Sequence, residues 1–141
     1  MNRYFFGILL AMVIFPNQTV NAMPSCGISS VSLNQLYLKY NNGNATATAL
    51  EIQCAQKYNI IFDAKNLNNI NGASRLIDRQ GHQIHTKMTI DGATRNLWRT
   101  PISPINYEKQ KFIVRVMLNE RPNAFQAAGE YEDQLRVSIV F

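Results

Sequence analysis

Residues 127–141, "AAGEYEDQLRVSIVF", close in an alternation of apolar and polar side chains. Successive side chains of a β-strand point to opposite faces of a sheet, so this alternation predicts a strand with one face toward a core. Its predicted inward residues are Leu135, Val137, Ile139 and Phe141. No turn residue or polar tail follows this strand signal, which leaves open what closes this side of the fold.

The same period of two runs through most of the chain, and no stretch after residue 22 keeps a helical spacing of apolar residues for three turns. The predicted inward faces carry these residues: Leu36, Leu38 and Tyr40; Thr48, Leu50, Ile52 and Cys54; Tyr58, Ile60 and Phe62; Ile84, Met88 and Ile90; Phe112, Val114, Val116 and Leu118. The short connection after Cys54 predicts that the strands on either side of it form a hairpin. About six or seven short strands separated by turns are typical of an immunoglobulin-like β-sandwich, so the sequence predicts an all-β fold of that type.

Turns and breaks separate these strands. The Asn-rich residues 66–72 predict a loop, and so does the segment around Pro101 and Pro104, because proline cannot donate to a ladder. After the Asn-rich loop we expect a strand, a turn and a strand. The Asp78 carboxylate should cap that turn, and Gly81 should take a positive φ at its exit.

The first 22 residues differ from the rest and predict a secretory signal peptide. Arg3 precedes an apolar run from Tyr4 to Phe15, and small residues occupy the positions before Met23 that a signal peptidase reads. A membrane anchor is the alternative, but about a dozen apolar residues are short of the roughly 20 that span a bilayer. We therefore expect cleavage after Ala22 and one domain over residues 23–141.

Both cysteines, Cys26 and Cys54, follow the predicted signal, and an exported protein meets an oxidising compartment. We expect them to form a disulfide. It would close a loop of about 29 residues and stabilise the fold by roughly 3.5 kcal/mol in the chain-entropy model. A reactive thiol would need a basic partner, and a zinc site would need two further ligands that the sequence does not obviously supply.

The chain carries a net charge of +5, with 14 basic and 9 acidic residues. Its Lys and Arg residues are scattered, without a run and without an aromatic-and-basic motif, which argues against nucleic acid as a partner. We interpret them as solvated surface, with adhesion to acidic surfaces as an alternative use.

Few side chains suggest chemistry. His82 and His85 are three positions apart, which on a strand places them on opposite faces, so we expect neither a metal site nor a cofactor. Glu130, Glu132 and Asp133 form an acidic cluster, which we interpret as solvated because no nucleophile accompanies it. The sequence has no hydrolase, zinc-protease or phosphate-loop motif, so no enzymatic activity is predicted.

Three segments, which together cover most of residues 46–141, resemble one family. This is the spore coat protein U domain, which is also the domain of Csu-type (archaic) chaperone–usher pilus subunits. The ending "AAGEYEDQLRVSIVF" resembles the family's C-terminal motif, and "IQCAQKYNIIFDA" resembles its Cys-ended strand followed by a Tyr-led strand. "IDGATRNLW" is similar to its stretch from an Asp to a Trp. The residues that match these motifs are Asp91, Ala93, Arg95, Trp98, Gly129, Tyr131 and Asp133.

The resemblance implies an incomplete sandwich that lacks its last strand. The implied acceptor groove lies beside the C-terminal strand and is lined by Leu135, Val137, Ile139 and Phe141. The implied partners are a periplasmic pilus chaperone, an outer-membrane usher and other pilus subunits. The chaperone and the other subunits are the strand donors, and a donated strand supplies main-chain hydrogen bonds and alternating side chains. The implied location is the surface of a Gram-negative bacterium, reached through the periplasm.

Cleavage after Ala22 would leave only Met23, Pro24 and Ser25 ahead of Cys26, too few for the donor segment that pilins of this family carry there. We therefore expect a subunit that accepts a strand and donates none, which in a head-to-tail fibre fits the tip; a different cleavage site is the alternative. The predicted function is a structural subunit of a surface fibre, minor or tip-proximal, that serves attachment or biofilm formation. A stand-alone secreted coat, matrix or adhesin-like binding protein is the alternative function.

Overall fold

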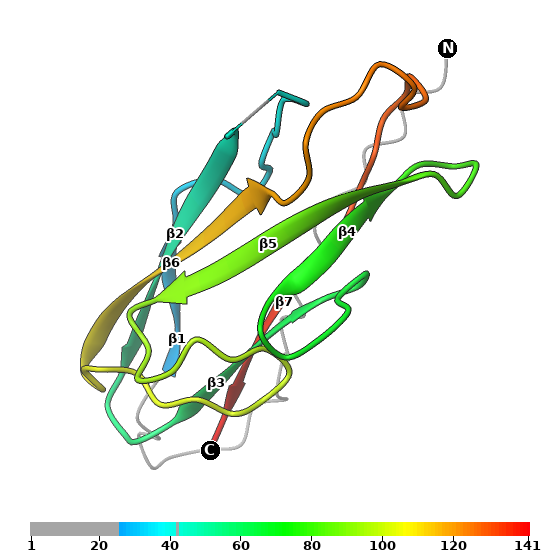
Figure 1. Ribbon diagram of the computed structural model, residues 1–141. Coiled ribbons are helices and arrows are strands. Elements are labelled where there is room, and N and C mark those ends of the chain that lie inside the picture. The colour runs from blue at the N-terminus through cyan, green and yellow to red at the C-terminus, as the bar shows by residue number, and fades with distance from the viewer. Residues whose placement is uncertain (1–25, 42) are drawn as a thin grey trace.

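Seven β-strands make up the part of the chain that the computed structural model describes, residues 26–41 and 43–141 (Figure 1). Their bounds are β1 Cys26–Val31, β2 Ala45–Cys54, β3 Asn59–Ala64, β4 Ala73–Ile77, β5 Gln83–Asp91, β6 Lys109–Leu118 and β7 Leu135–Val140. Within these residues there is no helix long and apolar enough to cross a membrane. The predicted signal peptide, residues 1–22, lies outside the described residues.

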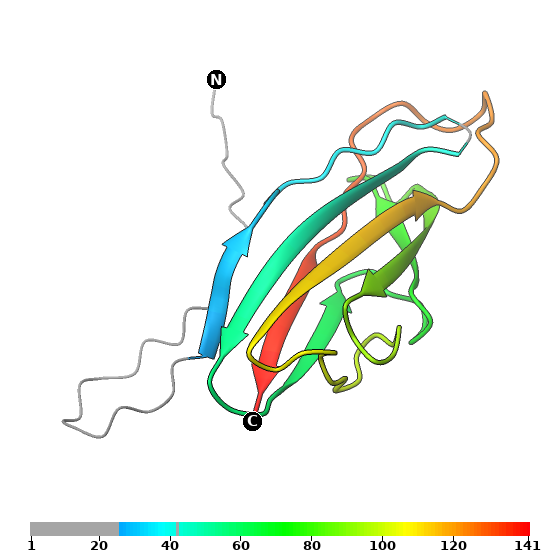
Figure 2. The ribbon, with the colours of Figure 1, turned by 90° about the vertical axis from the view of Figure 1, so that its left-hand side faces the viewer.

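The strands form two sheets around one core. The larger sheet has the order β1-β2-β6-β5-β4, the smaller one consists of β3 and β7, and every pair is antiparallel. Figure 2 shows the larger sheet in front, with β7 in red behind it. Buried side chains of both sheets belong to the same cluster, as in a sandwich. The prediction of an all-β, immunoglobulin-like sandwich is confirmed.

The period-two pattern gave the inward faces of the central strands. The inward residues that are confirmed as buried are Thr48, Leu50, Ile52 and Cys54; Tyr58, Ile60 and Phe62; Ile84, Met88 and Ile90; Phe112, Val114 and Val116. Leu118, at the end of β6, is half-buried. The β2–β6 ladder keeps one register from Ala45↔Met117 to Gln53↔Lys109. A slip by one residue would turn the buried set of β2 toward solvent, so burial itself specifies this register.

The predicted hairpin after Cys54 is wrong. β2 pairs with β1 and β6, and the chain then crosses to the smaller sheet, where β3 pairs with β7. Both edges of β2 are therefore occupied by other strands, which leaves no edge for β3. A short connection in the sequence is equally compatible with a hairpin and with a crossing between sheets, since only the distant strands decide which edges are taken.

The predicted strand through Leu36, Leu38 and Tyr40 is also wrong, although these three side chains are half-buried. This segment follows β1, and it is attached ahead of Leu36 through a side chain: the Thr48 hydroxyl donates to the Leu33 carbonyl at 2.6 Å. One strand that pairs with β2 lies earlier in the chain: it is β1, "CGISSV". Its glycine and serines carry too few apolar side chains to produce an alternation, so the pattern missed it.

The predicted loops and the turn are confirmed. Residues 66–72 contain no strand, and neither do residues 92–108 around the two prolines. In the turn between β4 and β5, the N–H of Gly81 donates to the carbonyl of Asp78 at 3.2 Å, and the carboxylate of Asp78 accepts from the N–H of Gln80 at 3.0 Å. Gly81 has a φ of 90°, a conformation that costs glycine little.

Candidate functional site

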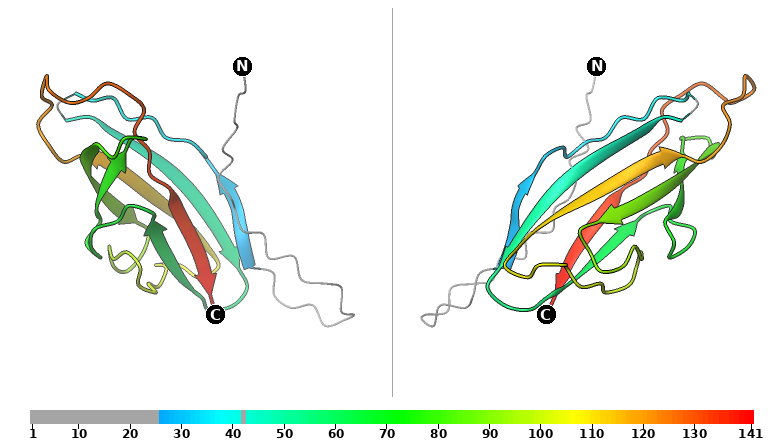
Figure 3. Two further views of the ribbon diagram at one scale, coloured as in Figure 1. Left: turned by 90° about the vertical axis from the view of Figure 1, so that its right-hand side faces the viewer. Right: turned by 60° about the vertical axis from the view of Figure 1, so that its left-hand side comes forward.

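Among the residues that the structure describes, the C-terminal strand β7 has one paired edge and one open edge. β7 pairs with β3 in a single register, from Asn59↔Val140 to Ala64↔Leu135. In residues 26–41 and 43–141 no other strand pairs with β7. Figure 3 (left) shows that this open edge faces the side of the sandwich on which β1 lies.

The hydrogen bonds of β3 show which main-chain groups of β7 are free. Ile60 exchanges two hydrogen bonds with Ile102, each of 2.9 Å, on the side of β3 away from β7. Main-chain groups of successive residues point alternately to the two sides of a strand, so it is Ile61 that pairs its N–H and C=O with β7, opposite Ser138. It follows that the N–H and C=O groups of three β7 residues face the open edge: Leu135, Val137 and Ile139.

The side chains of these same three residues pack against the core but remain half-buried. On the neighbouring strand β3, in contrast, Ile60 is 0% exposed and Phe62 is 1% exposed. On the β1 side of the sandwich, Ile28 is likewise only half-buried against the core. The core is thus closed along β3 and incompletely covered along the open edge of β7.

Phe141 was predicted to continue the inward face of this strand, and that prediction is wrong. β7 ends at Val140, which pairs with Asn59, the first residue of β3, so Phe141 lies one residue beyond the last pair of this ladder. The Phe141 side chain is 74% exposed. It lines a shallow depression together with Tyr58 and Tyr107.

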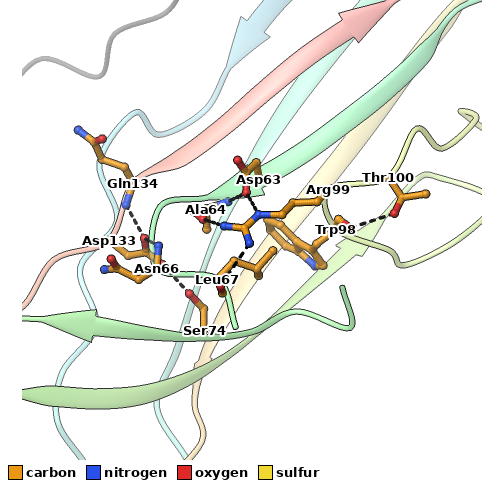
Figure 4. Close-up of polar contacts among 10 residues, drawn as sticks. All are labelled: Asp63, Ala64, Asn66, Leu67, Ser74, Trp98, Arg99, Thr100, Asp133 and Gln134. Atoms are coloured by element: carbon orange, nitrogen blue, oxygen red, sulfur yellow. Dashed lines mark hydrogen bonds and ion pairs between the residues drawn. The ribbon is translucent and has the colours of Figure 1, made fainter. Parts of the chain in front are cut away.

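The start of β7 is fixed by Asp133 (Figure 4). One carboxylate oxygen accepts from the N–H groups of Asn66 at 2.9 Å and Gln134 at 2.8 Å, and the other accepts from the hydroxyl of Ser74 at 2.7 Å. Burial raises the pKa of Asp133, and these three hydrogen bonds offset part of that effect. The interpretation of Asp133 as a solvated carboxylate is therefore wrong, because two segments distant in the sequence enclose it in the folded chain: the loop at Asn66 and strand β4 at Ser74.

The other residues of the C-terminal motif hold the loop before β7. The hydroxyl of Tyr131 donates to the carbonyl of Ala127 at 2.7 Å and accepts from the side-chain amide of Gln126 at 2.8 Å. Gly129 is exposed and has a φ of 154°. Glu130 and Glu132 are exposed, and the main chain of Glu132 bridges to Ile77 at the end of β4.

The matching residues at the end of β5 and in the segment that leads to β6 do not form a cluster. Trp98 is 0% exposed and packs edge-on against Phe62 with ring centroids 6.0 Å apart. Ala93 is half-buried and bridges to Pro104, whereas Asp91 and Arg95 are exposed. Trp98 is therefore a core residue, and the structure does not bring Asp91 or Arg95 to it.

An ion pair that the sequence gave no sign of lies beside Trp98 (Figure 4). The guanidinium of Arg99 donates to the carboxylate of Asp63 at 2.7 Å and to the carbonyl of Ala64 at 3.1 Å. Arg99 has a φ of 55°, the only positive φ outside glycine in the described part of the chain. Asp63 and Arg99 are 36 positions apart, so no local pattern links them.

The two cysteines are joined: Cys26 and Cys54 form a disulfide between the first residue of β1 and the last residue of β2. The two are also opposite one another in the β1–β2 ladder. The disulfide therefore fastens one edge strand of the larger sheet to its neighbour.

His82 lies in the turn between β4 and β5, and His85 lies on β5. A ring nitrogen of His82 lies 2.7 Å from the carboxylate of Asp78 in the β4–β5 turn. Burial acts to raise the pKa of Asp78, but the hydrogen bonds from His82 and Gln80 outweigh it and leave that pKa below its ordinary value. Across residues 26–41 and 43–141, no group of three or more His, Cys, Asp or Glu side chains is placed to hold a metal ion.

Comparison with known proteins gives a similarity of fold. No family model matches this sequence, and neither does any curated protein. Among solved structures, the chain is similar to a chain of the CsuC–CsuE chaperone–tip adhesion subunit pre-assembly complex from the archaic chaperone–usher Csu pili of Acinetobacter baumannii. The TM-score is 0.52 at 16% identity, over 84% of this chain and 40% of that chain. This protein thus shares a fold with a component of an archaic chaperone–usher pilus complex.

Proposed function

We propose that this protein is a structural subunit of a surface fibre of the archaic chaperone–usher type, and that the open edge of β7 receives a β-strand from another chain. The observation that carries the proposal is the combination found on Leu135, Val137 and Ile139. Within residues 26–41 and 43–141, no strand pairs with the edge that their main-chain groups face, and their apolar side chains are only half-buried against the core.

A strand added to this edge would supply both missing parts. Its main chain would bond to the free N–H and C=O groups, and its alternate side chains would cover the half-buried ones. Burial of four or five apolar side chains contributes a gross gain of roughly 6–15 kcal/mol before the cost of ordering the incoming strand. Left unpaired, the same edge is a site for uncontrolled association.

The partners in this proposal are strand donors: a periplasmic pilus chaperone before assembly, and another pilus subunit after exchange at an outer-membrane usher. The similarity to a chain of a chaperone–subunit complex supports this choice. The role is structural rather than enzymatic, at the cell surface of a Gram-negative bacterium, in attachment or biofilm formation. The finer proposal of a minor, tip-proximal position depends on the predicted cleavage after Ala22, which mass spectrometry of the exported protein's N-terminus decides.

The proposal is tested by measuring amide exchange with and without a strand donor. The probe is a synthetic peptide of about a dozen alternating valines and threonines, since such a peptide presents one apolar face as an extended strand. The amides of Val137 and Ile139 should exchange quickly in the chain alone and slowly with the peptide. The amide of Ile61, which faces β7 already, is the internal reference. A chain that unfolds cooperatively as a stable monomer, with slow exchange at Val137 and Ile139 before any peptide is added, would contradict the proposal.

A further inference from the structure

The smaller sheet has two outer edges, and the structure closes one of them. In the described part of the chain, no strand pairs with the outer edge of β7. Along the outer edge of β3 run residues 99–104, which we call the edge cap.

Main-chain hydrogen bonds attach the edge cap to β3. The N–H of Ile60 donates to the carbonyl of Ile102, and the N–H of Ile102 donates to the carbonyl of Ile60, both at 2.9 Å. At the other end of the cap, the N–H of Arg99 donates to the carbonyl of Phe62 at 2.8 Å. The cap therefore uses the groups of β3 that a further strand would need.

The side chain of Arg99 covers the last part of this edge (Figure 4). Its guanidinium binds the carbonyl of Ala64 at 3.1 Å and is itself held by the carboxylate of Asp63 at 2.7 Å. The same carboxylate oxygen accepts from the N–H of Ala64 at 2.8 Å. At the positive φ of Arg99, 55°, both its N–H and its side chain lie against β3. This backbone conformation costs free energy, which the contacts with β3 offset.

The edge cap does not create a new free edge in its turn. On the outer side of the cap, Pro101 has no N–H to donate, and the carbonyl of Ser103 accepts from the N–H of Thr94 at 2.9 Å. Prolines and occupied main-chain groups are the means by which sheet edges avoid unwanted pairing.

From these contacts we infer that the edge cap restricts strand addition on the smaller sheet to β7, and that Arg99 is the positioning residue that holds the cap on β3. The inference rests on the proposed function, since it concerns where the incoming strand is added. A strand placed beside β3 instead would leave the half-buried side chains of Leu135, Val137 and Ile139 uncovered. The cap thus separates the productive edge from an unproductive one.

The test uses Arg99→Ala, with Arg95→Ala as the matched control. Arg95 is an exposed arginine of the same loop and lies outside the cap. In Arg99→Ala the amides of Ile60 and Ile102 should exchange at least about tenfold faster, because the guanidinium hydrogen bonds that hold the cap closed are lost. The amide of Ile61, which faces β7, should exchange at the wild-type rate in both variants.

The alternating valine–threonine peptide supplies the second measurement. It should protect Val137 and Ile139 in the wild-type chain, and in Arg99→Ala it should protect Ile60 as well. Unchanged exchange at Ile60 and Ile102 in Arg99→Ala would overturn the inference, and so would equal acceleration at Ile61, which indicates general loss of stability. Protection of Ile60 by the peptide in the wild-type chain would overturn it too. Failure of the peptide to protect Val137 and Ile139 would count against the proposed function alone, because the exchange rates without peptide test the cap by themselves.

Discussion

Replacement of Val137 by aspartate should weaken strand addition at β7 about a hundredfold or more. The Val137 side chain is half-buried in the chain alone, so an incoming strand would cover the rest of it, a gain of about 1 kcal/mol or roughly half the value of a fully buried valine, which the substitution removes. An incoming strand would then bury the introduced carboxylate without a partner. An unpaired polar group costs about 1–3 kcal/mol in mutational data, and a charge costs more. Together these terms amount to roughly 3 kcal/mol or more, which weakens binding about a hundredfold or more.

Fluorescence titration with the alternating valine–threonine peptide measures this effect. The matched control is Ser138→Asp, which places the same charge one position away on the exposed face of β7. Its affinity for the peptide should stay within about threefold of wild type, since surface substitutions typically change free energies by about 0.5 kcal/mol or less. Burial raises the pKa of the carboxyl introduced at position 137, so peptide binding by Val137→Asp should partly recover as the pH falls toward about 4. Equal affinities of the two variants at neutral pH would refute the assignment of inward and outward faces on β7.

Four further variants test the framework of the fold by urea unfolding at saturating peptide. Gly72→Ala should destabilise the fold by roughly 2–4 kcal/mol, because a Cβ there would clash with the carbonyl oxygen of Met88 and would have to be accommodated at a φ of 92°. Gly81→Ala, at a φ of 90° with no atom within 4 Å, should cost only about 1–2 kcal/mol, and equal costs would refute the steric reasoning. Cys26→Ser should lower the free energy of unfolding by roughly 3.5 kcal/mol through the loop that the disulfide closes; an unchanged value would show that this link contributes nothing. The pKa of Asp133 is raised in the folded chain, so its ionisation opposes folding: stability should fall as the pH rises above the ordinary aspartate value of 3.8, and this fall should be smaller in Asp133→Asn, whereas identical pH profiles would exclude the effect.

Local patterns in the sequence were sufficient for the faces of most strands. The alternation in β2 and β6 identified their buried residues because side-chain direction in a strand depends only on the parity of the position. Turn chemistry around Asp78 and Gly81 was predicted for the same reason, since its hydrogen bonds join residues within four positions. The strand β1 was not predicted, because "CGISSV" contains too few apolar residues to produce an alternation.

Pairing between strands was not predictable in the same way. The connection from β2 to β3 was predicted to be a hairpin, but β3 belongs to the other sheet and pairs with β7, more than 70 positions further along the chain. Asp133 was interpreted as solvated, although Asn66 and Ser74 enclose it at separations of 67 and 59 positions. Arg99 and its contact with Asp63 had no sequence signal at all.

The sequence by itself determined that this is an all-β chain with a strongly patterned C-terminal strand, because those properties follow from residue type and the period of the backbone. The tertiary structure alone decided which edge of the smaller sheet is open. Edges are defined by main-chain hydrogen bonds, and every main chain offers the same N–H and C=O groups whatever its side chains. Which of those groups remain free on β7, and which are closed on β3 by residues 99–104, depends on segments that only folding brings together.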